Sequence, residues 1–241
     1  MPLDLGQTML QLDRVSRGLV ADSGQREARL TAFVDAASKV DAATAIAKTG
    51  YDSERPFLAA QVLDSLLGAY APVEPPMDWC TVAVDGSHID VDRHLPVGCY
   101  LINMGGCSLT YGSLPNASFF SQPSLYHRPE DLYLTDPSNP NYEEPVAGPL
   151  LGLIRTVQEL ERLAQAIAGV PAGLPTLALV DGSLVMWGLS GRGYPPFVKE
   201  AIIQDRLLPA LDQLREESQH RPLCLAAYVS LPRSAEVVNA A

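Results

Sequence analysis

Two apolar runs along the chain end in the same three residues. Thr81–Val84 is followed by Asp85-Gly-Ser, and Leu177–Val180 by Asp181-Gly-Ser. A short unbroken apolar run bounded by turn residues is typical of a strand that is buried on both faces. Asp-Gly marks the point where the chain turns out of the sheet. The pattern therefore predicts two central strands with Asp85 and Asp181 at their ends.

The remaining elements follow from the spacing of apolar residues. Helical signals run from about Leu3 to Ala71, and Pro56 and Gly68 are placed to begin and cap a last helix over 57–67. After the proline-rich segment Pro72–Pro76, which breaks regular structure, the pattern predicts strands over 79–84, 97–104 and 107–111 and then a long loop over 112–148. A helix over 149–168 and the second Asp-Gly-Ser strand follow. The chain then continues with a helix over 194–219, a strand over 223–229, and the first turn of a helix over 234–239.

This order resembles the ribonuclease-H-like arrangement, an α/β fold. A meander of three antiparallel strands, with a tight turn expected at Gly105-Gly106, is extended by two parallel strands through right-handed helical crossovers. We expect residues 77–241 to form this domain and residues 1–76 to form a helical N-terminal extension. The extension either packs on the main domain, which the composition favours, or serves as an arm for a dimer or a partner.

Composition narrows the class of protein. Hydrophobic residues make up 47% and charged residues 19%, which is normal for a globular protein. No apolar run approaches the roughly 20 residues of a membrane helix, and no signal peptide is visible at the N-terminus. The four cysteines are scattered without a CxxC pair. We therefore expect a cytoplasmic protein with reduced thiols, no membrane and no zinc site.

The charge and the acids together point to a kind of chemistry. A net charge of −11 argues against a surface that coats nucleic acid, because phosphate affinity comes from Lys and Arg. A local group of carboxylates, however, can hold metal ions. In the predicted fold the first and fourth strands are neighbours and the 149–168 helix covers them, so Asp85, Asp181 and Glu159 (or Glu161) should converge.

Phosphodiester hydrolysis is a reaction that uses such a group of carboxylates. Two divalent ions about 3.5–4 Å apart can neutralise the phosphate, activate water and stabilise the leaving oxygen. Carboxylate ligands suit Mg²⁺ or Mn²⁺. Gly86 and Gly182 would let a substrate backbone approach, and Ser87 and Ser183 would bond the carboxylates or water. Either Asp-Gly alone is more often a structural turn, and His88 and His94 are more often loop residues than ligands.

The long predicted loop is rich in aromatic residues, namely Phe119, Phe120, Tyr126, Tyr133 and Tyr142. Such side chains either stack on nucleobases or pin the loop to the core. We favour the second interpretation.

Several blocks resemble the NurA-domain nucleases. The first comprises Val84-Asp-Gly-Ser-His-Ile89, Asp92-Arg-His94, Tyr100–Gly105 and Tyr111-Gly112; the later ones are Arg155-Thr-Val-Gln-Glu159, Leu179-Val-Asp-Gly-Ser-Leu184 and Tyr228–Asn239. The resemblance runs from about residue 79 to the end, and residues 1–76 match only in being helical.

The resemblance implies a ribonuclease-H-like fold and manganese-dependent activity on DNA, both as a 5′–3′ exonuclease and as an endonuclease. It also implies a homodimer that works with a hexameric HerA-type ATPase in DNA end resection during double-strand break repair. Carried over by position, Asp85 and Asp181 fall on the two Asp-Gly-Ser metal ligands. Glu159 falls on the helical ligand, with Glu161 as the alternative.

One departure from the family leaves a second interpretation open. Family members continue beyond the position of Ala241 and carry further ligands there, so we expect the domain to be incomplete at its C-terminus. The alternative function is then a truncated, non-catalytic module that docks on a partner ATPase or on itself. A carbohydrate hydrolase with paired carboxylates is a remote third possibility.

Overall fold

The computed structural model describes residues 4–40, 60–90, 97–189, 193–230 and 234–240. The chain forms two compact units. The first comprises residues 1–73 together with 232–241, and the second comprises residues 74–231. The expected division was 1–76 and 77–241, and the structure instead groups the last ten residues with the N-terminal segment.

The first unit is dominated by a helix of 33 residues, α1, which spans Leu5–Ala37. Asp4 caps it, because its carboxylate accepts a hydrogen bond of 3.0 Å from the Gln7 amide. This helix lies within the segment for which the sequence predicts helical structure. A short helix, α7 (Glu236–Ala240), lies where the sequence predicts a first helical turn.

The helix predicted over 57–67 is wrong for its described part, because residues 60–67 are not helical. Local polar groups compete with the helical hydrogen bonds here. The Ser65 side chain accepts a hydrogen bond from the Leu67 amide, and the Ala60 amide donates to the Glu236 carbonyl at 2.8 Å. Residues 57–59 of this prediction lie outside the described residues.

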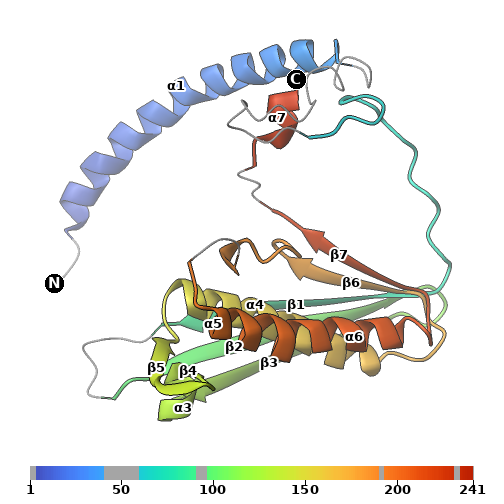
Figure 1. Ribbon diagram of the computed structural model, residues 1–241. Helices are drawn as coiled ribbons and strands as arrows, with labels where there is room; N and C mark the ends of the chain where they lie inside the picture. The colour runs from blue at the N-terminus through green and yellow to red at the C-terminus, as the bar shows by residue number, and fades with distance from the viewer. Residues whose placement is uncertain (1–3, 41–59, 91–96, 190–192, 231–233, 241) are drawn as a thin grey trace. The chain divides into compact units, whose positions relative to one another are not determined.

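The second unit is built on a five-stranded mixed sheet with the order β3-β2-β1-β6-β7 (Figure 1). Its strands are β1 (Trp79–Ile89), β2 (Tyr100–Tyr111), β3 (Asn116–Tyr126), β6 (Thr176–Asp181) and β7 (Leu223–Tyr228). β1, β2 and β3 are antiparallel, and β6 and β7 run parallel to β1. The predicted α/β class, and the adjacency of the two strands that end in Asp-Gly-Ser, are confirmed.

Two details of the predicted meander are wrong. Gly105 and Gly106 make no turn, because β2 passes straight through them, and the third strand is β3 instead. Gly106 serves packing: a Cβ atom there would lie 2.4 Å from the Phe120 ring and 2.7 Å from the Ala83 carbonyl oxygen. A glycine pair in a strand can mark close approach as readily as a turn, and here it marks close approach.

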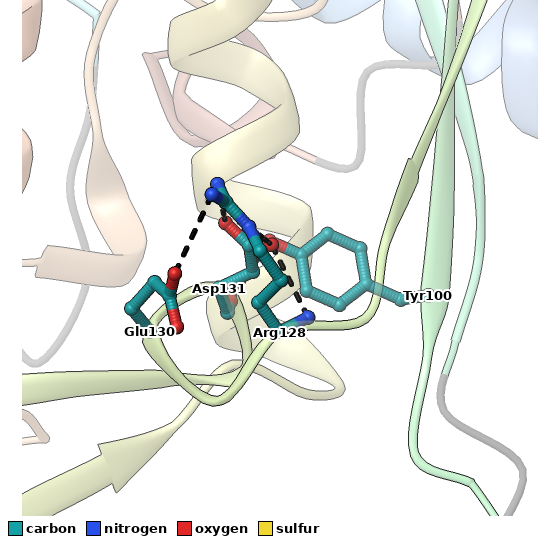
Figure 2. A network of polar contacts seen from close by, with 4 residues as sticks. All are labelled: Tyr100, Arg128, Glu130 and Asp131. Atoms are coloured by element: carbon teal, nitrogen blue, oxygen red, sulfur yellow. Dashed lines mark hydrogen bonds and ion pairs between the residues drawn. The ribbon is translucent and has the colours of Figure 1, made fainter.

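The predicted loop over 112–148 is also wrong, since most of it is ordered in regular elements. After β3 come α3 (Pro129–Leu132) and a hairpin of β4 (Tyr133–Asp136) with β5 (Asn139–Pro145). Figure 2 shows how α3 begins: the Arg128 guanidinium pairs with Glu130 and Asp131, and the Tyr100 hydroxyl donates to the Asp131 carbonyl at 3.1 Å.

Three aromatic residues of this segment pin it to the rest of the unit, as the favoured interpretation predicts. Tyr126 stacks on Tyr100 with ring centroids 4.6 Å apart, and Tyr142 meets Phe197 edge to face. Phe120 lies under the Arg162 guanidinium. Phe119 differs, because its side chain is 76% exposed.

Helices α4, α5 and α6 lie on one face of the sheet (Figure 1). α4 (Pro149–Ala168) spans the predicted range, and Leu151, Val157 and Leu163 on its inner side are fully buried. The helix predicted over 194–219 is confirmed as α5 (Pro196–Ile202), a π-helical stretch (Ile203–Leu207) and α6 (Leu208–Glu217), preceded by the 3₁₀ turn η1 (Trp187–Leu189). Pro209 has no amide hydrogen to donate, which accounts for the interrupted ladder there.

The central strands alternate between two faces. Val82, Val84 and Gly86 of β1 are buried toward α4, whereas Ala83 and Asp85 face the other way and are less buried. β6 alternates in the same manner and ends in the exposed Asp181. This second surface of the sheet is called the open face below. Within the described residues, no helix is long and apolar enough to span a bilayer.

Candidate active site

A pocket of about 310 Å³ lies where β1 and β6 end beside α4. All three acids that the sequence singles out line it: Asp85, Glu159 and Asp181. Arg155 and Thr156 of α4 line it as well, and so does Trp187. The fold therefore brings together residues that are 74 and 22 positions apart in the chain.

Asp85 and Asp181 occupy equivalent positions on neighbouring parallel strands. Val84 pairs with Val180 in the register of β1 and β6, and each aspartate is the next residue. Both side chains are exposed, so their carboxylates are hydrated and accessible to a ligand. Carboxyl ends of neighbouring parallel strands are a common place for ligand binding in α/β sheets.

Glu159 reaches the same pocket from the buried side of α4 and is only 4% exposed. Its Oε1 atom accepts a hydrogen bond of 3.0 Å from the Gly86 amide and lies 3.5 Å from the Arg155 Nε atom. Arg155 in turn donates to the Gly86 carbonyl oxygen. One turn of α4 is thereby fixed to the backbone that follows Asp85.

Gly86 is required by this contact. A Cβ atom at residue 86 would lie 2.7 Å from Glu159 Oε1, 2.9 Å from Met104 Cε and 3.0 Å from Arg155 Cγ. The space that the sequence assigned to an approaching substrate is thus filled by Glu159 at this glycine. Gly182, which has a φ of +98°, has no atom within 4 Å of such a Cβ and stays open.

Burial raises the pKa of the Glu159 carboxyl to about 7. The Arg155 charge and the Gly86 amide act in the opposite direction, whereas the negative charges of Asp85 and Asp181 raise the pKa further. Two nearby carboxylates and a dry surrounding both disfavour a third negative charge. A carboxyl with such a pKa beside other acids is a typical mark of a functional site.

Glu161, the alternative helical ligand, points elsewhere. Both of its carboxylate oxygens lie 2.8 Å from Arg206 nitrogen atoms, in a bidentate ion pair between α4 and the π-helical stretch. It does not line the pocket that contains the aspartates. Of the two glutamates, the structure places only Glu159 beside Asp85 and Asp181.

The other residues considered from the sequence have smaller parts. Ser183 lines the pocket, and its hydroxyl accepts a 3.0 Å hydrogen bond from the Val185 amide rather than bonding a carboxylate. Ser87 and His88 are exposed on β1 and do not line the pocket. His94 lies outside the described residues.

The donor set fits a hard divalent cation, although it is not closed around one. Among the described residues, no three His, Cys, Asp or Glu side chains are placed to share a metal ion. Mg²⁺ commonly binds through one or two carboxylates, keeps several waters and completes its shell with substrate phosphate. A cation beside Asp85 and Asp181 would also relieve the repulsion that helps to raise the pKa of Glu159.

Arg155 was given no functional role from the sequence, because it appeared only in a segment that resembles the NurA-domain nucleases. Its spacing of four residues from Glu159 is a usable signal, because side chains at i and i+4 on a helix are neighbours. What the spacing does not reveal is the second contact, to the Gly86 carbonyl, which depends on how α4 crosses β1.

Comparisons with known proteins add little to this geometry. No protein-family model matches the sequence, and no curated protein matches it. Two crystal structures of prototype foamy virus protease–reverse transcriptase resemble the chain weakly. The selenomethionine-labelled CSH mutant is 13% identical over 72% of this chain with a TM-score of 0.35, and the native protein is 14% identical over 70% with a TM-score of 0.34. This chain covers 20% of each, and likeness at this level supports no conclusion about function.

Proposed function

We propose that the chain is a metal-dependent nuclease that hydrolyses phosphodiester bonds in DNA. One observation carries the proposal: Asp85 and Asp181 at the ends of two parallel strands, and Glu159 from the helix that covers them, line a single pocket. The strand order supports the finer assignment to a ribonuclease-H-like fold.

Mn²⁺ or Mg²⁺ is the cofactor that this donor set favours, because all three candidate ligands are carboxylates. Bound between the strand ends, such ions would neutralise the phosphate and activate water. Asp85 and Asp181 would hold the cofactor, being the accessible carboxylates. Glu159, with its pKa near 7, can hold a proton or release one near neutral pH.

Arg155 has a positioning role in this proposal. Its contacts with Glu159 and with the Gly86 carbonyl keep the helix and the strand end in register. Its guanidinium is also the only Lys or Arg side chain among the residues that line the pocket, all of which the structure describes. Its positive charge would favour a phosphate group beside the acids.

The biological setting follows from the resemblance to NurA-domain nucleases. Within the proposal, the protein resects DNA ends as a 5′–3′ exonuclease and endonuclease, acts as a homodimer and works with a HerA-type hexameric ATPase.

Cleavage assays with matched variants test the catalytic proposal. Wild type should cut single- and double-stranded DNA only when Mn²⁺ or Mg²⁺ is present. Asp85→Asn, Asp181→Asn and Glu159→Gln should each lower the rate at least 100-fold. The first two remove a proposed metal ligand, and the third removes the carboxyl that can release or accept a proton near neutral pH. Glu161→Gln is the control, since it makes the same chemical change on the same helix outside the pocket, and it should cut at the wild-type rate.

Equal rates in all of these variants would reject the proposal. One observation favours the alternative, a non-catalytic module: no three acidic, His or Cys side chains among the described residues are arranged to bind one ion. Calorimetry with Mn²⁺ distinguishes the two functions. Absence of metal binding, together with co-purification with a HerA-type ATPase, would support the module.

A further inference from the structure

A second pocket, of about 590 Å³, lies on the open face of the sheet and shares two residues with the first. Asp85 and Asp181 line both pockets. We call this second pocket the open-face pocket. Its floor includes the side chains of Ala83, Cys107 and Leu179, which come from three neighbouring strands.

Exposed aromatic residues stand at both edges of the open-face pocket. Phe119 on β3 is 76% exposed, and Tyr228 on β7 is 70% exposed. On the same strand, Phe120 packs against Arg162 and Tyr126 stacks on Tyr100, whereas the Phe119 ring is largely exposed. Tyr228 is the direct partner of Asp181 in the register of β6 and β7, so it stands next to a candidate metal ligand.

The register places Phe119 in line with three floor residues across the sheet, and Tyr228 lies two residues further along β7 than the end of that line. Phe119 pairs with Cys107, and Cys107 pairs with Ala83, which pairs with Leu179. Four interstrand steps separate β3 from β7, a width of roughly 19 Å at about 4.8 Å a step. A surface of small side chains with an aromatic ring at each side suits a ligand that presents several flat, apolar groups one after another.

We propose that the open-face pocket binds unpaired nucleobases of the DNA strand whose phosphate lies at Asp85 and Asp181. The inference rests on the proposed function for the position of that phosphate. Bases stack on exposed aromatic side chains whatever their sequence, because each base has an apolar face. A base within a duplex has its faces covered by its neighbours, so the pocket selects single strands or splayed ends.

A second protein surface fits this pocket less well. A helix or a second copy that covered the floor would also cover Asp85 and Asp181, and burying two unpaired carboxylates is costly. A nucleic-acid strand leaves the acids facing the phosphate and a cation, and puts only its bases on the apolar floor. None of the residues lining this pocket, all of them described, is Lys or Arg, so base contacts rather than phosphate contacts must supply its affinity.

Binding of a fluorescent oligothymidylate to the full chain tests the inference, with Ca²⁺ as the divalent ion. An abasic oligonucleotide of the same length and charge serves as the second probe. Phe119→Ala and Tyr228→Ala should each weaken binding of the oligothymidylate by about 5- to 150-fold, the range for losing one stacked base. Affinity for the abasic probe should not change.

Matched variants separate stacking from loss of apolar surface. Phe119→Leu keeps an apolar side chain without a ring, and should bind nearly as weakly as Phe119→Ala. Tyr133→Ala removes a partly exposed aromatic side chain of the same unit that does not line the pocket, and should bind like wild type.

Each remaining outcome is decisive. Unchanged affinity in both alanine variants, with Mn²⁺-dependent cleavage intact, would overturn the inference and leave the proposed function standing. If wild type cuts no DNA, but the two alanine variants bind the oligothymidylate more weakly than wild type does, the result would support the base-binding pocket and reject the nuclease. A wild-type dimer that dissociates in both variants during sedimentation would show that a second copy covers the face, and would overturn the inference.

Discussion

At the scale of single residues, opposing interactions act on the pKa of the Glu159 carboxyl. Burial and the two aspartates raise its pKa from 4.5 to about 7, while Arg155 and the Gly86 amide limit the rise. In the unfolded chain the same carboxyl is hydrated and ionises near its ordinary value. The folded protein therefore binds more protons than the unfolded chain between about pH 4.5 and 7.

This difference predicts how stability depends on pH. The contribution of Glu159 is fully present below about pH 4.5 and is lost as the pH rises through about 7, since the unfolding free energy falls wherever the folded state binds more protons. The loss is on the order of 3 kcal/mol. Urea unfolding in EDTA should show wild type losing stability from pH 5 to pH 8 relative to Glu159→Gln. Parallel pH profiles would contradict the assigned cause.

Gly86 yields a second prediction at this scale. In Gly86→Ala, the new Cβ would displace Glu159 Oε1 and Arg155 Cγ, which are side-chain atoms that can move. The unfolding free energy should fall by only about 1 kcal/mol, but the glutamate would leave the Gly86 amide. Because misplacing a catalytic group by about 1 Å can cost 100-fold, Mn²⁺-dependent cleavage should drop at least 10-fold.

The matched control for Gly86 is Gly152 on α4. A Cβ atom there meets nothing within 4 Å. Gly152→Ala should keep the wild-type cleavage rate and gain up to about 1 kcal/mol of stability, because alanine is the better helix former. Equal activity of the two variants would show that the position of Glu159 does not matter to the reaction.

At the scale of elements, the Glu161–Arg206 pair ties α4 to the π-helical stretch. Both side chains are about 30% exposed, so solvent weakens their attraction. A double-mutant cycle of Glu161→Gln and Arg206→Gln should give a coupling energy of about 0.5–1 kcal/mol in chemical unfolding. Cleavage should be unaffected in all three variants. A coupling near zero would mean that the bidentate pair does not hold the helices together.

Elements with a strong local pattern were predictable, and those fixed by distant packing were not. The helix over 149–168 was predictable from its apolar periodicity, and the strands before Asp85 and Asp181 from their unbroken apolar runs. Gly105-Gly106 looks like a turn, but Phe120 packs over Gly106 and draws β2 into one long strand. Residues 60–67 have a helical pattern, but Ser65 offers competing hydrogen bonds.

The candidate site divides in the same way. The positions of Asp85 and Asp181 were predictable because the strand before each one can be recognised from its apolar run. The fold that aligns the two strands follows from the order of the elements. The choice between Glu159 and Glu161 was not, because both flank Leu160 and only the packing of α4 decides which one turns inward. Tyr228 and Phe119 were not grouped, because their proximity to the acids is a matter of register across five strands.

At the scale of the whole molecule, the charge balance restricts how the proposed nuclease could hold DNA. The chain has 17 Lys and Arg residues against 28 Asp and Glu residues. Among the described residues that line the two pockets, Arg155 is the only cation. At these two pockets the proposed nuclease would therefore obtain its affinity mainly from a bound divalent ion or from stacked bases.

This charge balance predicts an unusual salt dependence. For duplex DNA the slope of log K against log salt is about −0.9 for each phosphate that Lys or Arg neutralises, and many DNA-binding proteins make 6–10 such contacts. With Ca²⁺ present, the isolated chain should show a slope shallower than about −3, and EDTA should weaken binding at least 10-fold. Fluorescence anisotropy from 50 to 200 mM salt measures both effects. A steep slope that EDTA leaves unchanged would reveal a basic channel outside the two pockets, whereas a slope that steepens only when a HerA-type ATPase is added would show that the partner supplies the cations.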